Sequence, residues 1–181
     1  MSGRRVPIQL LEFVLGDGKT VSLSLAKAHF GPFEIVSNKL KRLSLDLCWA
    51  SAENLSNVML GSTSLETLSL RFAFISPSIV QGITLNKDSL KVISLSSAVG
   101  WTIQSLQALC QCTGLIELDL SQSYGPDQLD QASVEFLCKK LPEGLEKLSL
   151  KELPLSDEAL TDLLIRLQLV FVGLGCAFCK S

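Results

Sequence analysis

Leucine recurs along the chain in a six-residue phrase with apolar residues at its first, fourth and sixth positions. The phrases begin at Leu40, Leu65, Leu90, Leu115 and Leu145. Successive phrases start 25 residues apart three times and then 30 residues apart. Because side chains alternate along a strand, the fourth and sixth residues point to one face and the residue between them points to the other. Each phrase therefore predicts a short strand with one buried and one exposed face.

Apolar residues return at helical spacing between the phrases, as in Ile103, Leu106 and Leu109. Three helix starts carry residues that suit a first helical turn, namely Ser76 before Pro77, Asp130 before Gln131, and Ser156 before Asp157 and Glu158. Each unit is therefore predicted to be a strand followed by a helix.

A period of this length, with one strand and one helix in each unit, is typical of leucine-rich repeats. One unit cannot bury its apolar face alone, whereas stacked units bury a continuous core. We therefore predict an α/β leucine-rich-repeat solenoid, with a curved parallel sheet on its concave side and helices on its convex side. Residues 40–167 form the repeats in this interpretation, and residues 1–39 form an N-terminal cap or irregular first repeat.

The two ends of the chain depart from the repeat pattern. Alternating apolar residues at 11–15 and 21–25 flank the turn residues Gly16 to Lys19, which predicts a hairpin or an irregular first repeat. Residues 168–181 form an atypical apolar C-terminal tail without a leucine phrase, so we expect the repeats to stop at Leu167. The tail either folds over the last repeat as a cap or leaves core surface exposed, and the missing polar capping helix favours exposure.

Composition excludes several classes of function. The formal net charge of −2 and the scattered Lys and Arg residues give no basic surface for nucleic acid. Pro7, Gln9 and Glu12 interrupt the apolar stretch that a secretory signal would need, and the apolar run at 169–179 is too short to cross a bilayer. These features predict a soluble intracellular protein that contacts neither membranes nor nucleic acid.

Candidate chemistry is sparse. The six cysteines and the single histidine, His29, do not assemble a tetrahedral zinc set, and buried reduced thiols are the favoured interpretation. Gly18-Lys19-Thr20 is not a phosphate-binding loop, because Phe13 stands where that motif needs glycine. We expect no metal, no cofactor and no catalytic residue. An enzyme centred on His29 is the alternative that these residues leave open.

The exposed face of the predicted sheet is the candidate binding surface. Its outward-facing residues are expected to be Arg42, Ser44, Asp46, Thr67, Ser69, Arg71, Val92, Ser94, Ser96, Glu117, Asp119, Ser121, Lys147, Ser149 and Lys151. Just beyond the strands, Trp49, Phe74 and Tyr124 occupy one repeat position. These rings form an aromatic rim for a partner, or they pack the bends between strand and helix.

The segment His29-Phe30-Gly31-Pro32-Phe33, followed by the phrases at Leu40, Leu65 and Leu115, resembles the repeat region of F-box proteins of the S-phase kinase-associated type. Those proteins are substrate receptors of cullin-RING ubiquitin ligases. The resemblance runs from about Leu11 to Leu167. It implies a noncatalytic recognition scaffold that works in the nucleus and cytoplasm.

The resemblance also implies partners, namely a phosphorylated cell-cycle substrate and a Cks-type accessory protein. This chain has no segment similar to the F-box and carries about half of the family's repeats, so it is expected to be an incomplete receptor that does not bind the Skp adaptor. Candidate protein-binding residues on the concave face are Arg42, Arg71, Glu117, Asp119, Gln122, Tyr124, Lys147 and Lys151. The alternative function is a free-standing leucine-rich-repeat binder or inhibitor that is unrelated to ubiquitin.

Overall fold

The computed structural model describes residues 4–7, 9, 19–31, 39–48, 51–122, 129–167 and 171–173. The strands are β1 (Arg4–Arg5), β2 (Ser22–Ser24), β3 (Ala28–His29), β4 (Arg42–Ser44), β5 (Thr67–Ser69), β6 (Val92–Ser94), β7 (Glu117–Asp119), β8 (Lys147–Ser149) and β9 (Phe171–Gly173). The helices are α2 (Ala52–Gly61), α3 (Pro77–Leu85), α4 (Ile103–Cys110), α5 (Gln131–Lys140) and α6 (Asp157–Arg166). This alternation confirms the α/β class.

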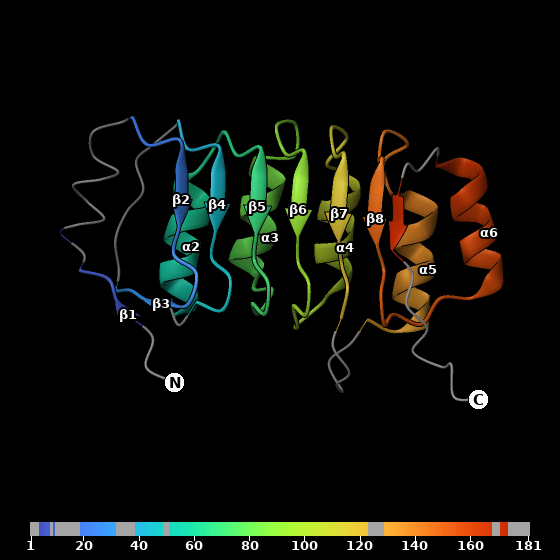
Figure 1. Cartoon of the computed structure of the whole chain (residues 1–181), viewed down its shortest axis with the longest axis horizontal. Coiled ribbons are helices and arrows are strands. Elements are labelled where there is room, and N and C mark those ends of the chain that lie inside the picture. Colours follow the sequence, from blue (N-terminus) through green and yellow to red (C-terminus); the bar gives the residue numbers. More distant parts are fainter. Residues whose placement is uncertain are drawn as a thin grey trace.

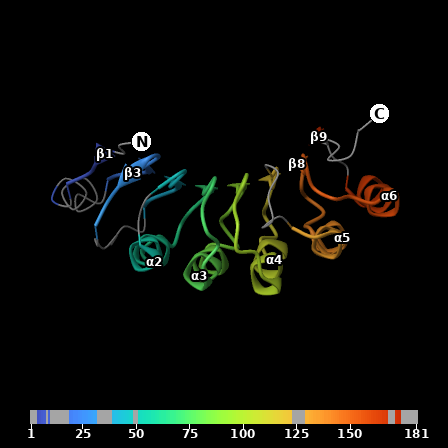
Figure 2. The same cartoon turned by 90° about the horizontal axis from the view of Figure 1, so that it is seen from below.

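Seven parallel strands form the main sheet, and they follow one another in chain order from β2 to β9 (Figure 1). The register joins equivalent residues of successive phrases, so that Arg42 lies beside Thr67 and Thr67 beside Val92. The molecule is curved, with the strands as its inner layer and the helices as its outer layer (Figure 2). Residues at one phrase position therefore form a row that crosses the whole sheet.

The helices begin where the sequence predicted. Ser76, Asp130 and Ser156 are N-caps, and each side chain accepts a hydrogen bond from the backbone N–H three residues later. Pro77 occupies the first turn of α3, where its missing N–H costs no hydrogen bond. These caps fix the start of each helix relative to the strand before it.

The fourth residue of each phrase forms the centre of the core. Leu43, Leu68, Ile93, Leu118 and Leu148 lie side by side in the register and are at most 2% exposed. Burying a leucine side chain stabilises the folded state by about 1.5–3 kcal/mol. The ladder of aliphatic side chains therefore holds neighbouring units together.

A tight turn follows the strand at the same place in five units. Its second residue has a φ between 55° and 60° although it is not glycine, at Lys27, Leu47, Phe72, Ser97 and Glu152. The N–H of Leu47 donates to the carbonyl of Arg71 at 2.9 Å, and the N–H of Phe72 donates to that of Ser96 at 3.0 Å. These bonds between units offset the cost of a left-handed backbone, which is about 1–2 kcal/mol for an L residue.

The N-terminal region supplies the first strand of the sheet. β2 pairs in parallel with β4, which places this part of residues 1–39 at the edge of the main sheet. β1 pairs in parallel with β3 in a separate two-stranded sheet. The expected first arm at 11–15 lies outside the described residues.

The C-terminal region adds a strand that the sequence analysis missed. β9 pairs in parallel with β8, and Val172 lies opposite Leu148. The sheet therefore continues beyond Leu167, the residue at which we expected the repeats to stop. Strand pairing uses backbone groups, so the β-favouring Phe-Val pair extends the sheet without a leucine phrase.

The buried ladder predicts a large cost for truncating one of its members. We expect Leu118→Ala to lower the free energy of unfolding by about 2–5 kcal/mol, because it leaves a cavity between neighbouring units. Urea denaturation measures this change. Leu85→Ala is the control, since Leu85 is 51% exposed and its truncation should cost about 0.5 kcal/mol. Equal losses for the two variants would contradict the ladder.

A second prediction concerns the contact between α2 and α3. A Cβ atom at Gly82 would lie 2.7 Å from both Cβ and Cε of Met59, so Gly82→Ala forces the helices apart. Overpacking costs about 1–3 kcal/mol and exceeds the gain in helix propensity of about 1 kcal/mol. We expect a net loss near 1 kcal/mol by thermal or urea denaturation. Gly144→Ala, which has open space around it, should change stability by less than about 0.5 kcal/mol.

Candidate functional site

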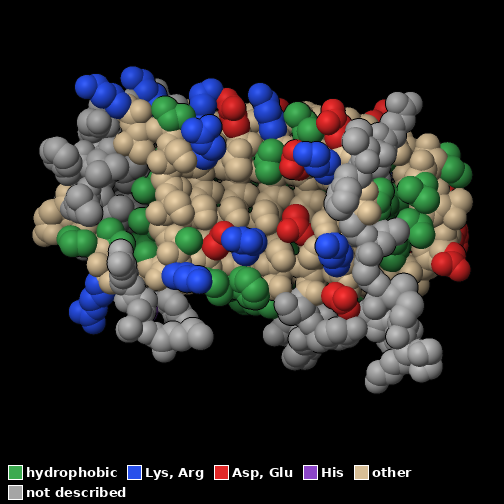
Figure 3. All heavy atoms as spheres, in the orientation of Figure 1, with side chains coloured by type: hydrophobic (Ala, Val, Ile, Leu, Met, Phe, Trp, Pro, Cys, Tyr) green, Lys and Arg blue, Asp and Glu red, His purple; other side chains and the backbone are tan. Residues whose placement is uncertain are grey.

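The inner side of the curved sheet, called the concave face below, displays the residues that alternate with the buried ladder. Figure 3 shows this face, with Lys, Arg, Asp and Glu side chains in two rows and a band of uncharged surface between them. The register places Ser44, Ser69, Ser94, Asp119 and Ser149 in one row across this face. The concave face is therefore polar and has small side chains along its middle.

Asp46 lies at the centre of the first charged group. Its Oδ1 accepts hydrogen bonds from Ser69 Oγ at 2.6 Å and from the Arg71 N–H at 2.9 Å. Its Oδ2 accepts a hydrogen bond from Nε of Arg71 at 2.9 Å and forms an ion pair with Nη2 of the same side chain, also at 2.9 Å. The Asp46 side chain is 9% exposed, whereas that of Arg71 is 53% exposed. Asp46 therefore holds an accessible guanidinium in a fixed position on the concave face.

Two opposing effects set the acidity of Asp46. Burial alone would raise its pKa, but the hydrogen bonds from Ser69 and Arg71 and the charge of Arg71 outweigh burial. The pKa of Asp46 is therefore lowered from its ordinary value of 3.8. The carboxylate is ionised at neutral pH and stabilises the fold in that form.

Glu117 and Lys147 form a second charged group on β7 and β8. Lys147 Nζ lies 2.5 Å from Glu117 Oε1, and this hydrogen bond raises the pKa of Lys147. Lys41 and Glu66 form a similar ion pair just before β4 and β5, and its hydrogen bond lowers the pKa of Glu66. Exposed ion pairs add little stability, so these pairs mainly set the pattern of charge that a partner would meet.

A hollow of about 270 Å³ lies on the concave face and is lined by residues of β6, β7 and β8. Its lining includes Ser94, Glu117, Asp119, Lys147 and Ser149. Asp119 Oδ1 accepts hydrogen bonds from Ser121 Oγ at 2.6 Å and from the Ser121 N–H at 3.0 Å. Ser121 Oγ lies 2.7 Å from Ser149 Oγ. The hollow combines a fixed carboxylate, an ion pair and hydroxyl groups, which suits recognition of a polar surface.

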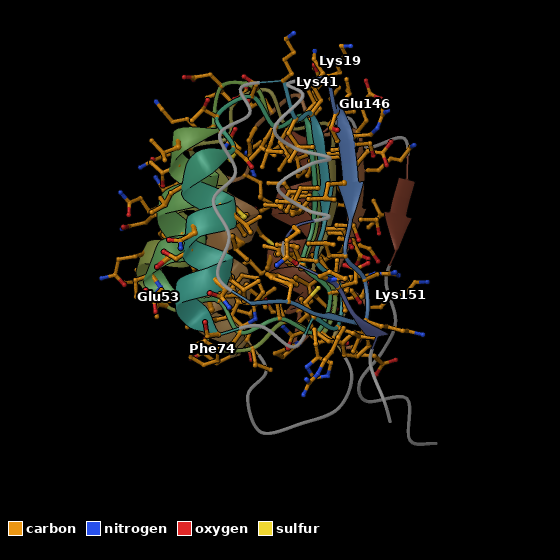
Figure 4. All side chains as sticks on the ribbon, turned by 90° about the vertical axis from the view of Figure 1, so that its left-hand side faces the viewer. Lys19, Lys41, Glu53, Phe74, Glu146 and Lys151 are labelled. Atoms are coloured by element: carbon orange, nitrogen blue, oxygen red, sulfur yellow. The ribbon has the colours of Figure 1, made fainter. Side chains whose placement is uncertain are left out.

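The structure separates the predicted binding residues into groups. Glu117, Asp119 and Lys147 line the hollow, whereas Arg42 and Arg71 belong to β4 and the turn after β5. Lys151 follows β8, and Figure 4 shows it on the strand side of the molecule, opposite the helix layer that carries Glu53. These cations and carboxylates are spread along the concave face.

Gln122 does not belong to the exposed surface. Its side chain is 5% exposed and donates a hydrogen bond to the carbonyl of Ala98 at 3.3 Å. Its backbone N–H donates to the carbonyl of Lys151 at 3.0 Å. Gln122 therefore joins three successive units and is unavailable to a partner. Tyr124 lies outside the described residues.

Phe74 is the aromatic residue of the expected rim that the structure describes, because Trp49 and Tyr124 lie outside the described ranges. Its ring covers Gly100, where a Cβ atom would lie 2.6 Å from the ring and φ is 79°. The residue is nevertheless 62% exposed. Figure 4 places it at the edge of the molecule beside the helices and away from Lys41. Phe74 thus packs a bend and presents apolar surface outside the concave face.

The helix side carries a second hollow, of about 360 Å³, between the starts of α3 and α4. Its lining includes Ile75, Pro77, Val80 and Thr102, and it lacks charged side chains among the residues described there. This helix-side hollow is an alternative to the concave face as a contact surface.

The described cysteines have the properties of buried thiols. Burial raises the pKa of Cys48, Cys110 and Cys138 to about 11 and that of Cys112 to about 12. Cys48 Sγ donates a hydrogen bond to the carbonyl of Leu25 at 2.7 Å. Protonated thiols are poor nucleophiles and poor metal ligands, so these cysteines serve the fold. Cys176 and Cys179 lie outside the described residues.

Other functional groups were sought across the described ranges. There, no three His, Cys, Asp or Glu residues gather in a way that could hold a metal ion. His29 belongs to β3, and its carbonyl accepts a hydrogen bond from the Val6 N–H at 2.9 Å. None of the described helices combines the length and the apolar character needed to cross a membrane.

The candidate list from the sequence missed residues that matter to the site. Asp46 was expected to face outward but was not singled out, although its spacing of 25 residues from Arg71 places the two side by side. Ser94 and Ser149 line the hollow from the same phrase position as Asp119.

Comparison with protein-family models and with curated proteins found no match for this chain.

The lowered pKa of Asp46 predicts a pH-dependent contribution to stability. A group whose pKa falls on folding stabilises the native state above its unfolded pKa and loses that effect as pH falls through the folded value. We expect Asp46→Asn to destabilise the protein at pH 7, and the difference from the unmodified chain to shrink below about pH 3.8. Urea denaturation at pH 7, 5, 4 and 3 measures both variants.

Asp88→Asn is the matched control, because the Asp88 side chain is 84% exposed and its removal tests the loss of a surface charge alone. A difference between Asp46→Asn and the unmodified chain that stays constant down to pH 3 would contradict the assigned role of the carboxylate.

Proposed function

We propose that the chain is a noncatalytic protein-interaction scaffold, built as a leucine-rich-repeat solenoid whose concave face binds a partner protein. The observation that carries this proposal is the row-by-row display of polar side chains by the in-register strands. Extended inner faces of repeat proteins are their usual binding surfaces. Exposed side chains at one phrase position can vary in charge because the buried ladder supplies apolar contacts between the units that do not depend on them.

The charges of the concave face favour a polar protein partner. Arg71 is held by Asp46, and Lys147 is held by Glu117, so both cations have fixed positions and remain half exposed. Preorganised charged groups increase specificity and association rate more than affinity. Such a face suits a partner that presents acidic or phosphorylated groups among basic ones.

The resemblance to the repeats of S-phase kinase-associated F-box proteins extends the proposal to a pathway and to particular partners. In this form the chain contributes to substrate recognition for an SCF-type ubiquitin ligase in the nucleus and cytoplasm. Its partners would be a phosphorylated cell-cycle substrate and a Cks-type accessory protein. The Skp adaptor is not a proposed partner of this chain.

A binding experiment tests both parts of the proposal. The whole chain is mixed with a Cks-type protein and a phosphorylated cell-cycle inhibitor peptide, and affinity is measured by calorimetry. We expect Lys147→Glu to weaken binding by roughly tenfold or more, as for a central interface residue. The exchanged pair Glu117→Lys with Lys147→Glu restores the internal ion pair, yet it should still bind weakly because the charges have changed places. Lys139→Glu on α5 is the helix-side control.

Three results would change the conclusion in different ways. Full binding by the exchanged pair would show that Lys147 acts through the fold and would contradict its role in recognition. No binding of either protein, with crosslinks from another partner on the concave face, would reject the ubiquitin pathway but keep the scaffold. Crosslinks confined to the helix-side hollow would reject the concave face itself.

A further inference from the structure

The edge of the sheet at which the strands begin carries a row of equivalent residues, most of them charged. These residues occupy the second position of each phrase, and the row runs Lys41, Glu66, Lys91, Ile116 and Glu146. Backbone hydrogen bonds join the row. The Glu66 N–H donates to the Lys41 carbonyl at 2.8 Å, and the Lys91 N–H donates to the Glu66 carbonyl at 2.9 Å. The register therefore fixes the order and spacing of these side chains.

Cations dominate the part of this edge nearest the N-terminal end. Arg42 begins β4 next to Lys41, and both residues are exposed, as is Lys91. Figure 3 shows Lys and Arg side chains along the upper edge of the concave face toward this end. Figure 4 places Lys19 at the same edge as Lys41. We call the surface formed by Lys41, Arg42 and Lys91 the basic edge.

Glu66 shows that these cations act together on a carboxylate. Lys41 Nζ donates a hydrogen bond to Glu66 Oε1, and this bond is the main reason why the pKa of Glu66 is lowered. The charges of Lys41, Lys91 and Arg42 lower it further. Three positive charges therefore lie near one negative charge, although the formal net charge of the chain is −2. The Lys41 side chain remains 50% exposed beside Glu66.

We propose that the basic edge binds an acidic segment of a partner protein, in which neighbouring Asp or Glu side chains pair with Lys41, Arg42 and Lys91. Neighbouring strands lie about 4.8 Å apart, so the step from β4 across β5 to β6 spans about 10 Å. An extended peptide covers this distance with about three residues, at about 3.3 Å each. A short run of acidic residues is therefore enough to reach all three cations.

The basic edge lies where the strands begin and uses neither the hollow nor Lys147. The inference therefore goes beyond the proposed function and does not rest on it. Lysine and arginine side chains held in order by the register can attract an acidic segment and set its position, since complementary charges raise the association rate and the specificity.

A short acidic peptide fits this edge better than a nucleic acid does. Glu146 is the next charged member of the row after Lys91, so a longer polyanion would meet a carboxylate there. Single-stranded nucleic acids also bind by stacking their bases on aromatic rings. In the part of the chain that the structure describes, the exposed rings of Phe72 and Phe74 follow β5. Figure 4 shows Phe74 at the opposite edge from Lys41.

Fluorescence anisotropy of a labelled hexaglutamate peptide, titrated with the whole chain, tests the proposal. We expect binding that weakens several-fold between roughly 20 and 150 mM salt, because salt screens exposed charges. Lys91→Glu should weaken binding by at least about tenfold, since it replaces an attractive charge by a repulsive one. Lys139→Glu is the matched control, because it makes the same change at an exposed position in the last turn of α5 and should leave binding unchanged.

Glu66→Gln gives the sharpest test, because it removes the carboxylate that competes with the peptide for Lys41. We expect this variant to bind the peptide about threefold to tenfold more tightly than the unmodified chain. The lost ion pair is exposed and contributes little to stability. A gain in affinity also cannot result from a chain that fails to fold, so this variant keeps the result interpretable.

Several outcomes would overturn the proposal. One is the absence of binding by the unmodified chain at about 1 mM and low salt. Others are a Glu66→Gln chain that binds no more tightly, and equal weakening by Lys91→Glu and Lys139→Glu. Oligothymidylate of equal charge that binds as tightly and responds to the same variants would assign the edge to nucleic acid instead. Peptide binding by a chain that binds neither the Cks-type protein nor the inhibitor peptide would still support the basic edge.

Discussion

The in-register parallel pairing of equivalent residues is the constraint on which the rest of the structure depends. Because Leu43 lies beside Leu68 and Leu68 beside Ile93, each buried side chain contacts its own counterpart in the next unit. The pairing is fixed by backbone hydrogen bonds, and a shift by one residue would turn every leucine to the solvent. The same pairing sets which residues meet on the concave face, so core and surface share one register.

This shared register explains how an ion pair that is weak on an ordinary surface is held in a fixed geometry here. Asp46 and Arg71 are 25 residues apart in sequence, yet two hydrogen bonds and an ion pair hold them together. An isolated ion pair on a surface contributes little, because long side chains lose entropy when they meet. Here the turn already places the Asp46 carboxylate beside the next turn, so less freedom is lost. The register thus fixes the geometry of this ion pair at a low cost in side-chain entropy.

The parts of the fold that repeat were predictable, and the parts that depend on one neighbour were not. Periodicity locates the strands, the ladder and the caps at Ser76 and Asp130, since each follows from a local pattern. Gln122 was placed on the surface because its sequence position gives no sign of a hydrogen bond to Ala98, 24 residues away. β9 was missed because backbone pairing needs no leucine phrase. Sequence patterns indicate which face of a strand or helix a residue lies on, but not which residue of the next unit it contacts.

The helices at the ends of the described layer differ in environment from those in its middle. Among the described helices, α3, α4 and α5 each pack against a helix on both sides, and Cys138 of α5 is 1% exposed. The last described helix keeps the same amphipathic design, so Leu164 presents an apolar side chain toward the next place in the stack. Burying a leucine from this exposure is favourable by about 1 kcal/mol or more, since full burial contributes about 1.5–3 kcal/mol. The apolar side chain that α6 exposes therefore belongs to a surface distinct from the polar concave face.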